Sequence, residues 1–390
     1  MADRSFRSAI NLARRAALGR PFSAPANGRR RTVRVSLGDP QAPLACVLDV
    51  LARNGLLAAS GRLRDEVQLV SVGDHFDWGK RRDRAAAAAD GVAMLAWLAL
   101  HPADQVIICA GNHDLARVGE LADLDDATFA QAQAEADAAH VHGRFDPAKE
   151  AALLAKYPQF PSAEFVERDL STFRVVQREW VAFLLTQRRL KLAHAAGPSL
   201  LITHASITLD EFSALGIPLE QAAEAGALAR ALNLALDHAW ATHRGGPFRI
   251  PGLHVPGSAA TGEGRGMLYH RASTLASEAA MMTRAVPRRR YSPFRLPPGL
   301  TQVIGHIRDA KSRRLLGLED WNARDGVLRN LRVEGRTWAY GHGPRPVAQS
   351  TESVVLYVDG SLRGCASAEY ELLDLDTLQR WTPPRAWSTA

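Results

Sequence analysis

The sequence predicts a layered α/β core. Short apolar segments rich in β-branched residues alternate along the chain with longer segments whose apolar residues recur at helical spacing. This alternation is typical of sheets that are covered by helices. The composition agrees with it, because 46% of the 390 residues are hydrophobic, 23% are charged and 7% are aromatic. Such a chain can bury a large core, which excludes a disordered or collagen-like protein.

Three strands separated by helices are expected in the first part of the chain. The strands are residues 32–37, 67–72 and 105–110, and the helices between them are residues 44–57 and 84–100. Each strand is short and apolar, and each ends at a glycine followed by Asp or Asn. Polar side chains that can bind a metal therefore stand at the carboxyl ends of the strands, where open α/β sheets bind their ligands.

The rest of the chain adds strands, helices and two insertions. Residues 121–170 are polar and rich in alanine, and we expect them to form a helical insertion or cap. We expect residues 32–390 to form one domain, with a second, loop-rich insertion at about 212–300. The remaining expected elements are strands over 199–203, 300–304 and 354–359 and helices over 180–185 and 219–243.

Basic residues are concentrated at the start of the chain. In residues 1–31 arginine is frequent and Asp3 is the only acid, a composition that resembles a transit peptide. We expect this segment to form a basic accessory arm or a fraying terminus. The whole chain has 48 Lys and Arg against 41 Asp and Glu, a net charge of +7. Such an excess attracts polyanions, but no stripe of interleaved basic and aromatic residues accompanies it, so we do not expect a nucleic-acid partner.

The cysteines and the hydropathy indicate a cytoplasmic protein with no membrane span. Cys46, Cys109 and Cys365 lie far apart and show no CxxC spacing. This odd, sparse set argues against a disulfide scaffold and against a cysteine zinc site, and it suits a reducing compartment. The sequence has no uncharged apolar run of about 18 residues, the length that a membrane-spanning helix needs.

Five polar clusters follow the predicted strands. They are Asp39-Pro40-Gln41, GDHFDWG at 73–79, GNHD at 111–114, Thr203-His204-Ala205 and Gly305-His306. Carboxylates, an Asn amide and imidazoles together suit Mn²⁺, Fe or Zn²⁺ better than a calcium site or a cysteine zinc site. One such cluster is more often a simple turn, but five in one order, each closing a strand, indicate a metal centre.

The order of these clusters resembles the calcineurin-like metallophosphoesterase superfamily. GDHFDWG, GNHD, a strand-terminal His and a Gly-His pair carry the resemblance, which covers residues 33–308 and the late strand at 356–360. The helix around Trp180, the segment at Lys191 and residues 201–205 are similar to its bacterial phosphoprotein-phosphatase-like branch. The resemblance implies a β-sandwich flanked by helices and a hydrolase of phosphate esters, in which a water or hydroxide bridging two metal ions attacks phosphorus.

The resemblance also implies a role for each matching residue. The implied metal ligands are Asp39 and Gln41 for the first ion, Asp74 as a bridge, and Asn112, His204 and His306 for the second ion. His113 would be the general acid that protonates the leaving oxygen, and Asp77 would orient it. Mn²⁺ is the first expectation for both ions, with Fe or Zn²⁺ as alternatives. The expected partner is a phosphorylated substrate, either a phosphoprotein or a small phosphate ester.

The sequence departs from the family pattern at three positions. Gln41 stands where the first motif usually has a histidine, and its carbonyl oxygen is a weaker donor than imidazole. Trp78 stands where the pattern GDxxDRG has a phosphate-clamping arginine. Of the basic residues that could replace that arginine, we expect Arg271 and Arg117 to bind substrate. Arg308 stands in place of a second histidine in the last motif, which leaves the first metal with few ligands.

Three other functions stay open at this point. The first is hydrolysis of a dinucleoside polyphosphate, with Trp78 stacked on a base. The second is a nuclease, which only the charge supports. The third is a non-catalytic phosphate-binding scaffold with a degenerate site, which the three departures suggest. Against a scaffold, the other motif residues are all present. We expect His75, inside the second motif, to lie beside the site or at the surface.

Overall fold

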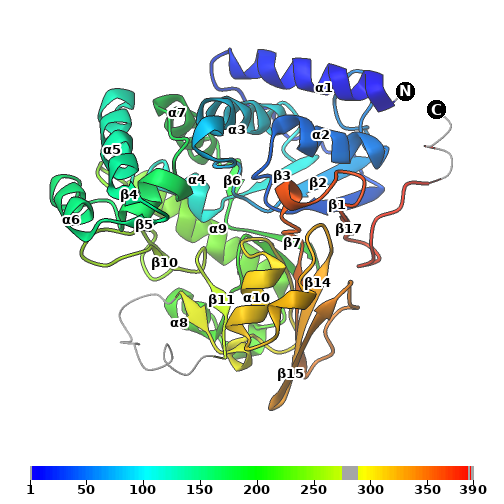
Figure 1. Ribbon diagram of the computed structural model, residues 1–390. Helices are drawn as coiled ribbons and strands as arrows, with labels where there is room; N and C mark the ends of the chain where they lie inside the picture. Colours follow the sequence, from blue (N-terminus) through cyan, green and yellow to red (C-terminus); the bar gives the residue numbers. More distant parts are fainter. Residues whose placement is uncertain (1, 275–288, 385–386, 388–390) are drawn as a thin grey trace.

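Two sheets lie face to face at the centre of the computed structural model, and helices cover them (Figure 1). The structure describes residues 2–274, 289–384 and 387. Part of the loop-rich insertion predicted at about 212–300 therefore lies outside the described residues. The mixed α/β class predicted from the sequence is confirmed.

The first sheet has five strands in the order β17-β1-β2-β3-β6. Its strands are β1 (Val33–Leu37), β2 (Val67–Ser71), β3 (Val106–Cys109), β6 (Leu190–Lys191) and β17 (Leu373–Asp374). The first four are parallel and β17 is antiparallel to β1. Since β1, β2 and β3 run in the same direction, the polar residues that follow them reach the same edge of the sheet.

The second sheet has six strands in the order β15-β14-β16-β13-β8-β7. Its strands are β7 (Ala193–Gly197), β8 (Leu200–Thr203), β13 (Thr301–Ile304), β14 (Arg329–Glu334), β15 (Thr337–His342) and β16 (Glu352–Tyr357). Strands β8, β13 and β16 are parallel, and β7 and β14 are antiparallel to their neighbours. The hairpin of β14 and β15, visible at the lower edge of Figure 1, was not among the predicted elements.

Alternation along the strands separates the core into layers. Leu69 of β2 packs among the covering helices, whereas its neighbour Val70 packs between the two sheets. Ile202 and Val303 of the second sheet meet Val70 in that inner layer. Neighbouring side chains of a strand point to opposite faces, so both faces of each short strand are buried. This explains why the sequence shows continuous apolar runs at these strands.

Four helices cover the first sheet: α1 (Ala2–Ala17), α2 (Leu44–Arg53), α3 (Arg84–Ala99) and α7 (Val175–Thr186). The segment expected as an accessory or fraying arm is largely α1, which packs on α2 and α3. Ala9 and Ala13 of this helix are fully buried. Gly61 lies against the backbone of Ala9, where a Cβ atom would clash. The small residues of α1 therefore allow close packing, and the helix belongs to the main body.

The segment predicted as a helical insertion has a small apolar core of its own, at the left of Figure 1. It contains α5 (Asp126–Ala139), the hairpin of β4 (His140–Val141) and β5 (Arg144–Phe145), α6 (Pro147–Lys156) and the π-helix η2 (Phe165–Asp169). Phe129, Phe160 and Phe173 are fully buried in that core. We refer to residues 121–170 as the cap.

The other elements complete the edges and the second sheet. α9 (Ala225–Thr242) packs on β7, and α10 (Asp309–Leu315) shares an apolar cluster with the outer face of β14 and β16. The shorter elements are η1 (Arg81–Asp83), α4 (Asn112–Ala116), α8 (Leu209–Leu215), η3 (Leu219–Gln221), β9 (His254–Val255), β10 (Arg265–Gly266), β11 (Arg271–Ala272), β12 (Arg290–Tyr291), η5 (Pro293–Arg295), η6 (Asp320–Asn322) and η7 (Leu362–Gly364).

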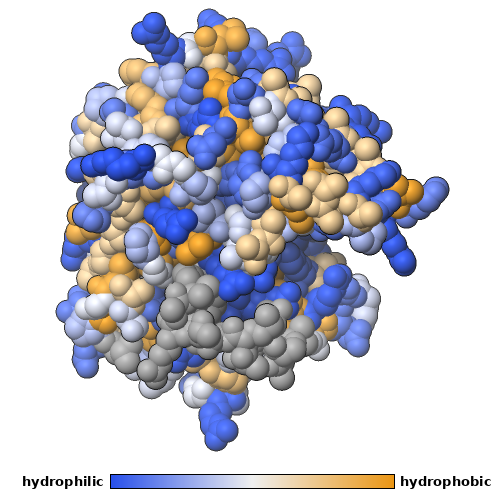
Figure 2. Space-filling view, turned by 90° about the vertical axis from the view of Figure 1, so that its left-hand side faces the viewer, coloured by the Kyte–Doolittle hydropathy of each residue, from blue (hydrophilic) through white to orange (hydrophobic). Residues whose placement is uncertain are grey.

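The surface mixes polar and apolar residues. Figure 2 shows hydrophilic and hydrophobic side chains interspersed over the face that carries the cap. Across the part of the chain that the structure describes, none of the helices combines the length and the apolar character needed to cross a bilayer.

Candidate metal centre and its cavity

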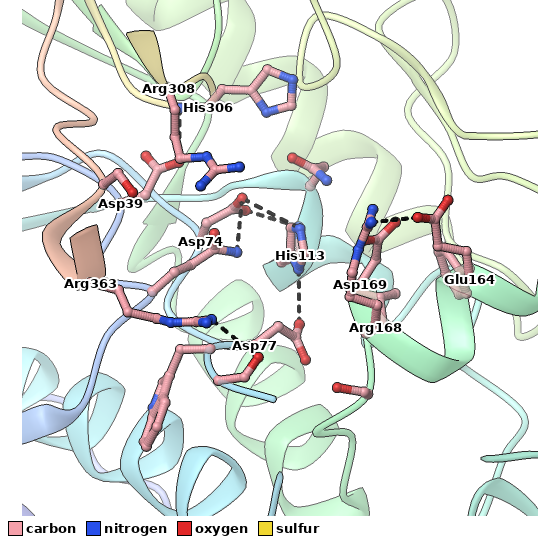
Figure 3. Close-up of a pocket in the computed structure, with 18 of the residues that line it drawn as sticks. Asp39, Asp74, Asp77, His113, Glu164, Arg168, Asp169, His306, Arg308 and Arg363 are labelled. Carbon is pink, nitrogen blue, oxygen red and sulfur yellow. Dashed lines mark hydrogen bonds and ion pairs between the residues drawn. The ribbon is translucent and has the colours of Figure 1, made fainter. Parts of the chain in front are cut away.

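The five polar clusters of the sequence meet at one edge of the paired sheets (Figure 3). Asp39 follows β1, Asp74 follows β2, and Asn112 opens α4 directly after β3. From the second sheet, His204 follows β8 and His306 follows β13. The parallel strands of both sheets thus deliver these side chains to the same place.

His204 is at the centre of a group of metal-capable atoms. Its Nε2 atom lies 3.1 Å from His306 Nδ1, 3.1 Å from Asn112 Oδ1 and 3.5 Å from Asp74 Oδ2. Its Nδ1 atom lies 2.9 Å from the carbonyl oxygen of Val72. That carbonyl can only accept, so Nδ1 carries the proton, and the lone pair of Nε2 faces the group. We call Asp74, Asn112, His204 and His306 the donor group.

The donor group fits a divalent cation. An Asn oxygen, a carboxylate and the bare nitrogen of His204 are acceptors that face one another, an arrangement that a cation between them stabilises. His306 Nε2 is buried and has no hydrogen-bond partner, and the same is true of Asp39 Oδ1. Asp74, His204 and His306 each offer a ligand atom within 4.8 Å of the others. The mixed oxygen and nitrogen set suits Mn²⁺, Fe or Zn²⁺.

Asp39 and Gln41 lie beside the donor group but add fewer donors. Asp39 Oδ2 accepts the backbone N–H of His306 at 2.8 Å. Burial raises the pKa of Asp39 well above its usual value, and the carboxylates of Asp359 and Asp74 raise it further. Gln41 approaches Asp74 Oδ2 at 3.5 Å through its side-chain amide. A cation here would relieve the crowding of negative charge around Asp39.

The backbone at the strand ends bends so that these side chains can converge. Asp74, Asp77 and His306 have φ angles of 56°, 66° and 68°, in the left-handed region that non-glycine residues rarely adopt. Gly111 and Gly305 lie so close to the carboxylates of Asp74 and Asp39 that a Cβ atom would overlap them. The glycines of the motifs therefore make room for the carboxylates.

Asp114 forms hydrogen bonds with residues of both the second and the third cluster. Its carboxylate accepts the backbone N–H groups of Gly111 at 2.8 Å, Asp74 at 2.9 Å and His75 at 3.0 Å. It also contacts His75 Nδ1 at 3.0 Å. His75, expected beside the site or at the surface, is buried and has Nε2 2.9 Å from Ser71 Oγ. Asp114 is the last residue of GNHD, and no feature of the sequence predicts that it links these two clusters.

His113 and Asp77 form a pair at the wall of the cavity. His113 Nδ1 lies 2.9 Å from Asp77 Oδ2, and His113 Nε2 lies 3.8 Å from Asp74 Oδ2. Thr172 fixes the other oxygen of Asp77 through a hydroxyl hydrogen bond of 2.6 Å. Burial lowers the pKa of His113, but the carboxylates of Asp74 and Asp77 outweigh this and raise it to about 9. His113 is therefore protonated at neutral pH, with Nδ1 held and Nε2 available.

Arg117 is not exposed to the cavity, so the expectation that it binds substrate is wrong. Its side chain is 0% exposed, and Nη1 lies 2.6 Å from Asp77 Oδ2. It also donates to the carbonyl of His113 at 2.9 Å and to Gln177 Oε1 at 3.1 Å. Although burial raises the pKa of Asp77, Arg117 and His113 hold it below its usual value. Arg117 lies three positions after GNHD, at the end of the short helix α4, and its side chain points into the protein core instead of into the cavity.

The donor group opens into a cavity of about 1280 Å³. Asp39, Gln41, Asp74, Asn112, His113 and His306 line it, as do Trp78 and Arg271. Arg271 pairs with Glu263 at 3.0 Å. The cap closes one side through the π-helix η2, which contributes Arg168 and Asp169. Helices of this rare type are frequent at functional sites.

Asp359 and Arg363 are among the lining residues that were not predicted as site residues. Asp359 follows β16, so it is a sixth polar residue at the end of a parallel strand. Arg363 follows four residues later in η7. The common position at a strand end is a signal that the sequence contains for Asp359, but nothing in it places Arg363 near the second cluster.

Comparisons with known proteins add nothing to the functional assignment, which therefore rests on the geometry of the site. No protein-family model matches the chain. No curated protein matches it either.

Proposed function

We propose that this protein is a metal-dependent hydrolase of phosphate esters, with the calcineurin-like architecture that its motifs resemble. The paired sheets with helices outside and polar residues at the strand ends support the architecture. A phosphorylated substrate is the proposed partner, either a phosphoprotein or a small phosphate ester. The free cysteines support the cytoplasmic compartment that forms part of the proposal.

One observation carries the proposal: His113, held by Asp77 through Nδ1, faces the same cavity as the donor group. Ester hydrolysis needs positive charge at the phosphoryl oxygens and a proton for the leaving oxygen. The donor group and the His113–Asp77 pair would supply these from neighbouring positions. A purely structural metal site has no use for an oriented acid next to it.

Asp74, Asn112, His204 and His306 would hold one divalent cation, and Asp39 and Gln41 with Asp74 would hold a second more weakly. When bound, such cations stabilise the charge that develops on a transferring phosphoryl group. Mn²⁺ is the proposed ion, with Fe or Zn²⁺ as alternatives.

The proton transfer would be carried out by His113. Asp77 holds Nδ1 of the imidazolium, so the proton available to the substrate is on Nε2. Arg117 and Thr172 fix Asp77 from behind. The raised pKa of His113 keeps the proton in place until a leaving oxygen gains negative charge. Residues of the cap and of the loops that follow the strands of the second sheet line the cavity.

The test is a hydrolysis assay on p-nitrophenyl phosphate, with and without added Mn²⁺ and with excess chelator. We expect activity only with a divalent cation, and we expect His113→Asn to lower turnover by about 10²–10⁴-fold, the range for loss of a general acid. His238→Asn is the matched control, because His238 is exposed on α9 away from the cavity. Full activity in chelator would refute the proposal.

The size of the cavity favours a second candidate substrate. Trp78 and several cations line about 1280 Å³, which is more room than a single phosphate needs. A dinucleoside polyphosphate would use this space for a base and a phosphate chain. Adding this compound and a phosphopeptide to the assay separates the substrates. Metal binding without hydrolysis of any substrate would favour a phosphate-binding scaffold.

A further inference from the structure

The cations that line the cavity fall into two groups. Arg81, Arg168 and Arg271 each pair with a carboxylate of the cap or of Glu263. Within the described part of the chain, Lys80, Arg308, Lys311 and Arg363 line the cavity with no carboxylate at ion-pair distance. A cation that no carboxylate neutralises is available to an anion. The second group therefore contains the candidates for binding a phosphate.

Of the two arginines in the second group, Arg363 is the one whose side chain forms a hydrogen bond with the loop of the second cluster. Its Nη1 atom donates to the carbonyl oxygen of Gly79 at 3.1 Å. Gly79 follows Trp78 and is two residues after Asp77, which holds His113. Figure 3 shows Arg363 entering the site from the side opposite Arg168 and Asp169. Arg363 thus brings a guanidinium to the loop that orients the proposed acid.

The other unpaired cations are placed less favourably. Arg308 interacts electrostatically with Asp359, a carboxylate that also lines the cavity, so part of its charge is already balanced. Burial and the neighbouring Arg271 together lower the pKa of Lys311 to about 8, so a fraction of this lysine is neutral at neutral pH. Lys80 lies on the same loop, but lysine binds oxyanions as a point charge and lacks the planar fork of arginine.

The backbone holds Arg363 in a fixed position. Asp359 Oδ1 accepts the N–H of Ser361 at 2.9 Å, and the side chain of Leu362, the first residue of η7, is buried. Gly364 packs against Asp325 so closely that a Cβ atom would clash. The side chain of Arg363 is exposed, and the anchored turn together with the hydrogen bond to Gly79 restricts its guanidinium, which reduces the freedom that is lost when a ligand binds.

We propose that Arg363 binds the phosphoryl oxygens of the substrate, in the role that an arginine at position 78 cannot fill because that residue is Trp78. The inference rests on the proposed function, and it names the residue that recognises the phosphate. With one N–H of Nη1 on Gly79, the remaining N–H groups of the fork can donate to two oxygens of a phosphate. Arg363, which is 284 residues from Gly79 in the sequence, would thus supply the arginine that the second cluster lacks.

The experiment measures binding of inorganic phosphate to Arg363→Ala, Arg363→Lys and the wild type by equilibrium dialysis, together with phosphate inhibition of hydrolysis. We expect Arg363→Ala to weaken phosphate binding by about 10- to 100-fold, as loss of a charge-assisted pair does. Arg363→Lys should lie between the two, because it keeps the charge without the fork. Metal content and melting temperature should not change.

Arg82→Ala is the matched control, because the side chain of Arg82 is 82% exposed beside Asp83 and does not line the cavity. Phosphate binding by Arg363→Ala equal to that of the wild type would overturn the inference, even if the wild type is an active esterase. A wild type that binds phosphate through Arg363 but hydrolyses no ester would refute the proposed function alone. A wild type that binds no phosphate would overturn the inference.

Discussion

Replacing Arg117 with methionine removes the charge that balances Asp77 and keeps a side chain of similar length. The two charged groups lie 2.6 Å apart, and their side chains are 0% and 1% exposed. Removal of one partner from a buried pair costs about 3–5 kcal/mol, because the remaining charge stays in an apolar environment. The free energy of unfolding should therefore fall by about 3–5 kcal/mol, a large part of the roughly 5–15 kcal/mol of a typical protein.

Urea denaturation measures this loss, with an unchanged dependence on urea concentration as the check that the same surface unfolds. The control is a double-mutant cycle with Asp77→Asn. When both charges are removed, the loss should be smaller than the sum of the single losses by about 0.5–3 kcal/mol. The opposite result, an Arg117→Met protein as stable as the wild type but with a raised KM, would mean that Arg117 binds substrate and that the buried pair is unimportant.

Three further predictions concern the acid, the metal and pH. Asp77→Asn should lower turnover less than His113→Asn does. The double variant should turn over substrate no more slowly than His113→Asn, because both changes affect the same proton transfer. Additive losses of turnover would contradict this prediction. Calorimetric titration with Mn²⁺ should show two sites of unequal affinity. Gln41→His should strengthen binding at the weaker site, and each tenfold gain in affinity corresponds to about 1.4 kcal/mol. Two equal affinities, with no stronger binding in Gln41→His, would show that Gln41 is not the weak ligand. Burial lowers the pKa of His101 to about 3, so between pH 6.5 and pH 3 the unfolded chain binds a proton that the folded chain does not. Stability should thus fall as the pH falls, by about 2 kcal/mol from pH 7 to pH 5 at this residue; urea denaturation of His101→Gln should show a smaller fall, and an equal fall would assign the effect elsewhere.

The sequence predicted the inner parallel strands well because each has one strong local signal. β1, β2, β3, β8, β13 and β16 lie within about two residues of the predicted ranges. β14 carries Arg329 and Asn330 at buried positions, so its pattern is not that of an apolar strand. The burial of Arg329 is compensated by hydrogen bonds that it donates to the carbonyls of Ile307 and Asp359. Only the folded chain brings these partners together. Such compensation cannot be seen in a local pattern.

The candidate site likewise contains residues with a local sequence signal and residues that are placed by contacts formed only in the fold. With the exception of Asp359, the cavity residues that follow a central strand were predicted, because a strand end fixes where its next side chain lies. Arg117 was misplaced because a single turn of α4 decides whether it faces the cavity or the core, and the sequence does not specify that turn. Asp114 and Arg363 act through contacts with residues of other clusters, and a sequence without its fold has no such contacts.

Two hydrogen bonds at the site connect the two sheets. His204, at the end of β8, donates to the carbonyl of Val72 beyond β2, and the backbone N–H of His306, beyond β13, donates to Asp39 beyond β1. The donor group likewise takes Asp74 and Asn112 from one sheet and both histidines from the other. A cation held there would link the two sheets, so that metal binding and the packing of the sheets against each other would be coupled. At a hundredfold excess over its Kd, such a ligand adds about 2.7 kcal/mol to the stability of the folded state. Chelation would then loosen the protein as a whole, and resistance to proteolysis becomes a measure of metal occupancy that needs no substrate.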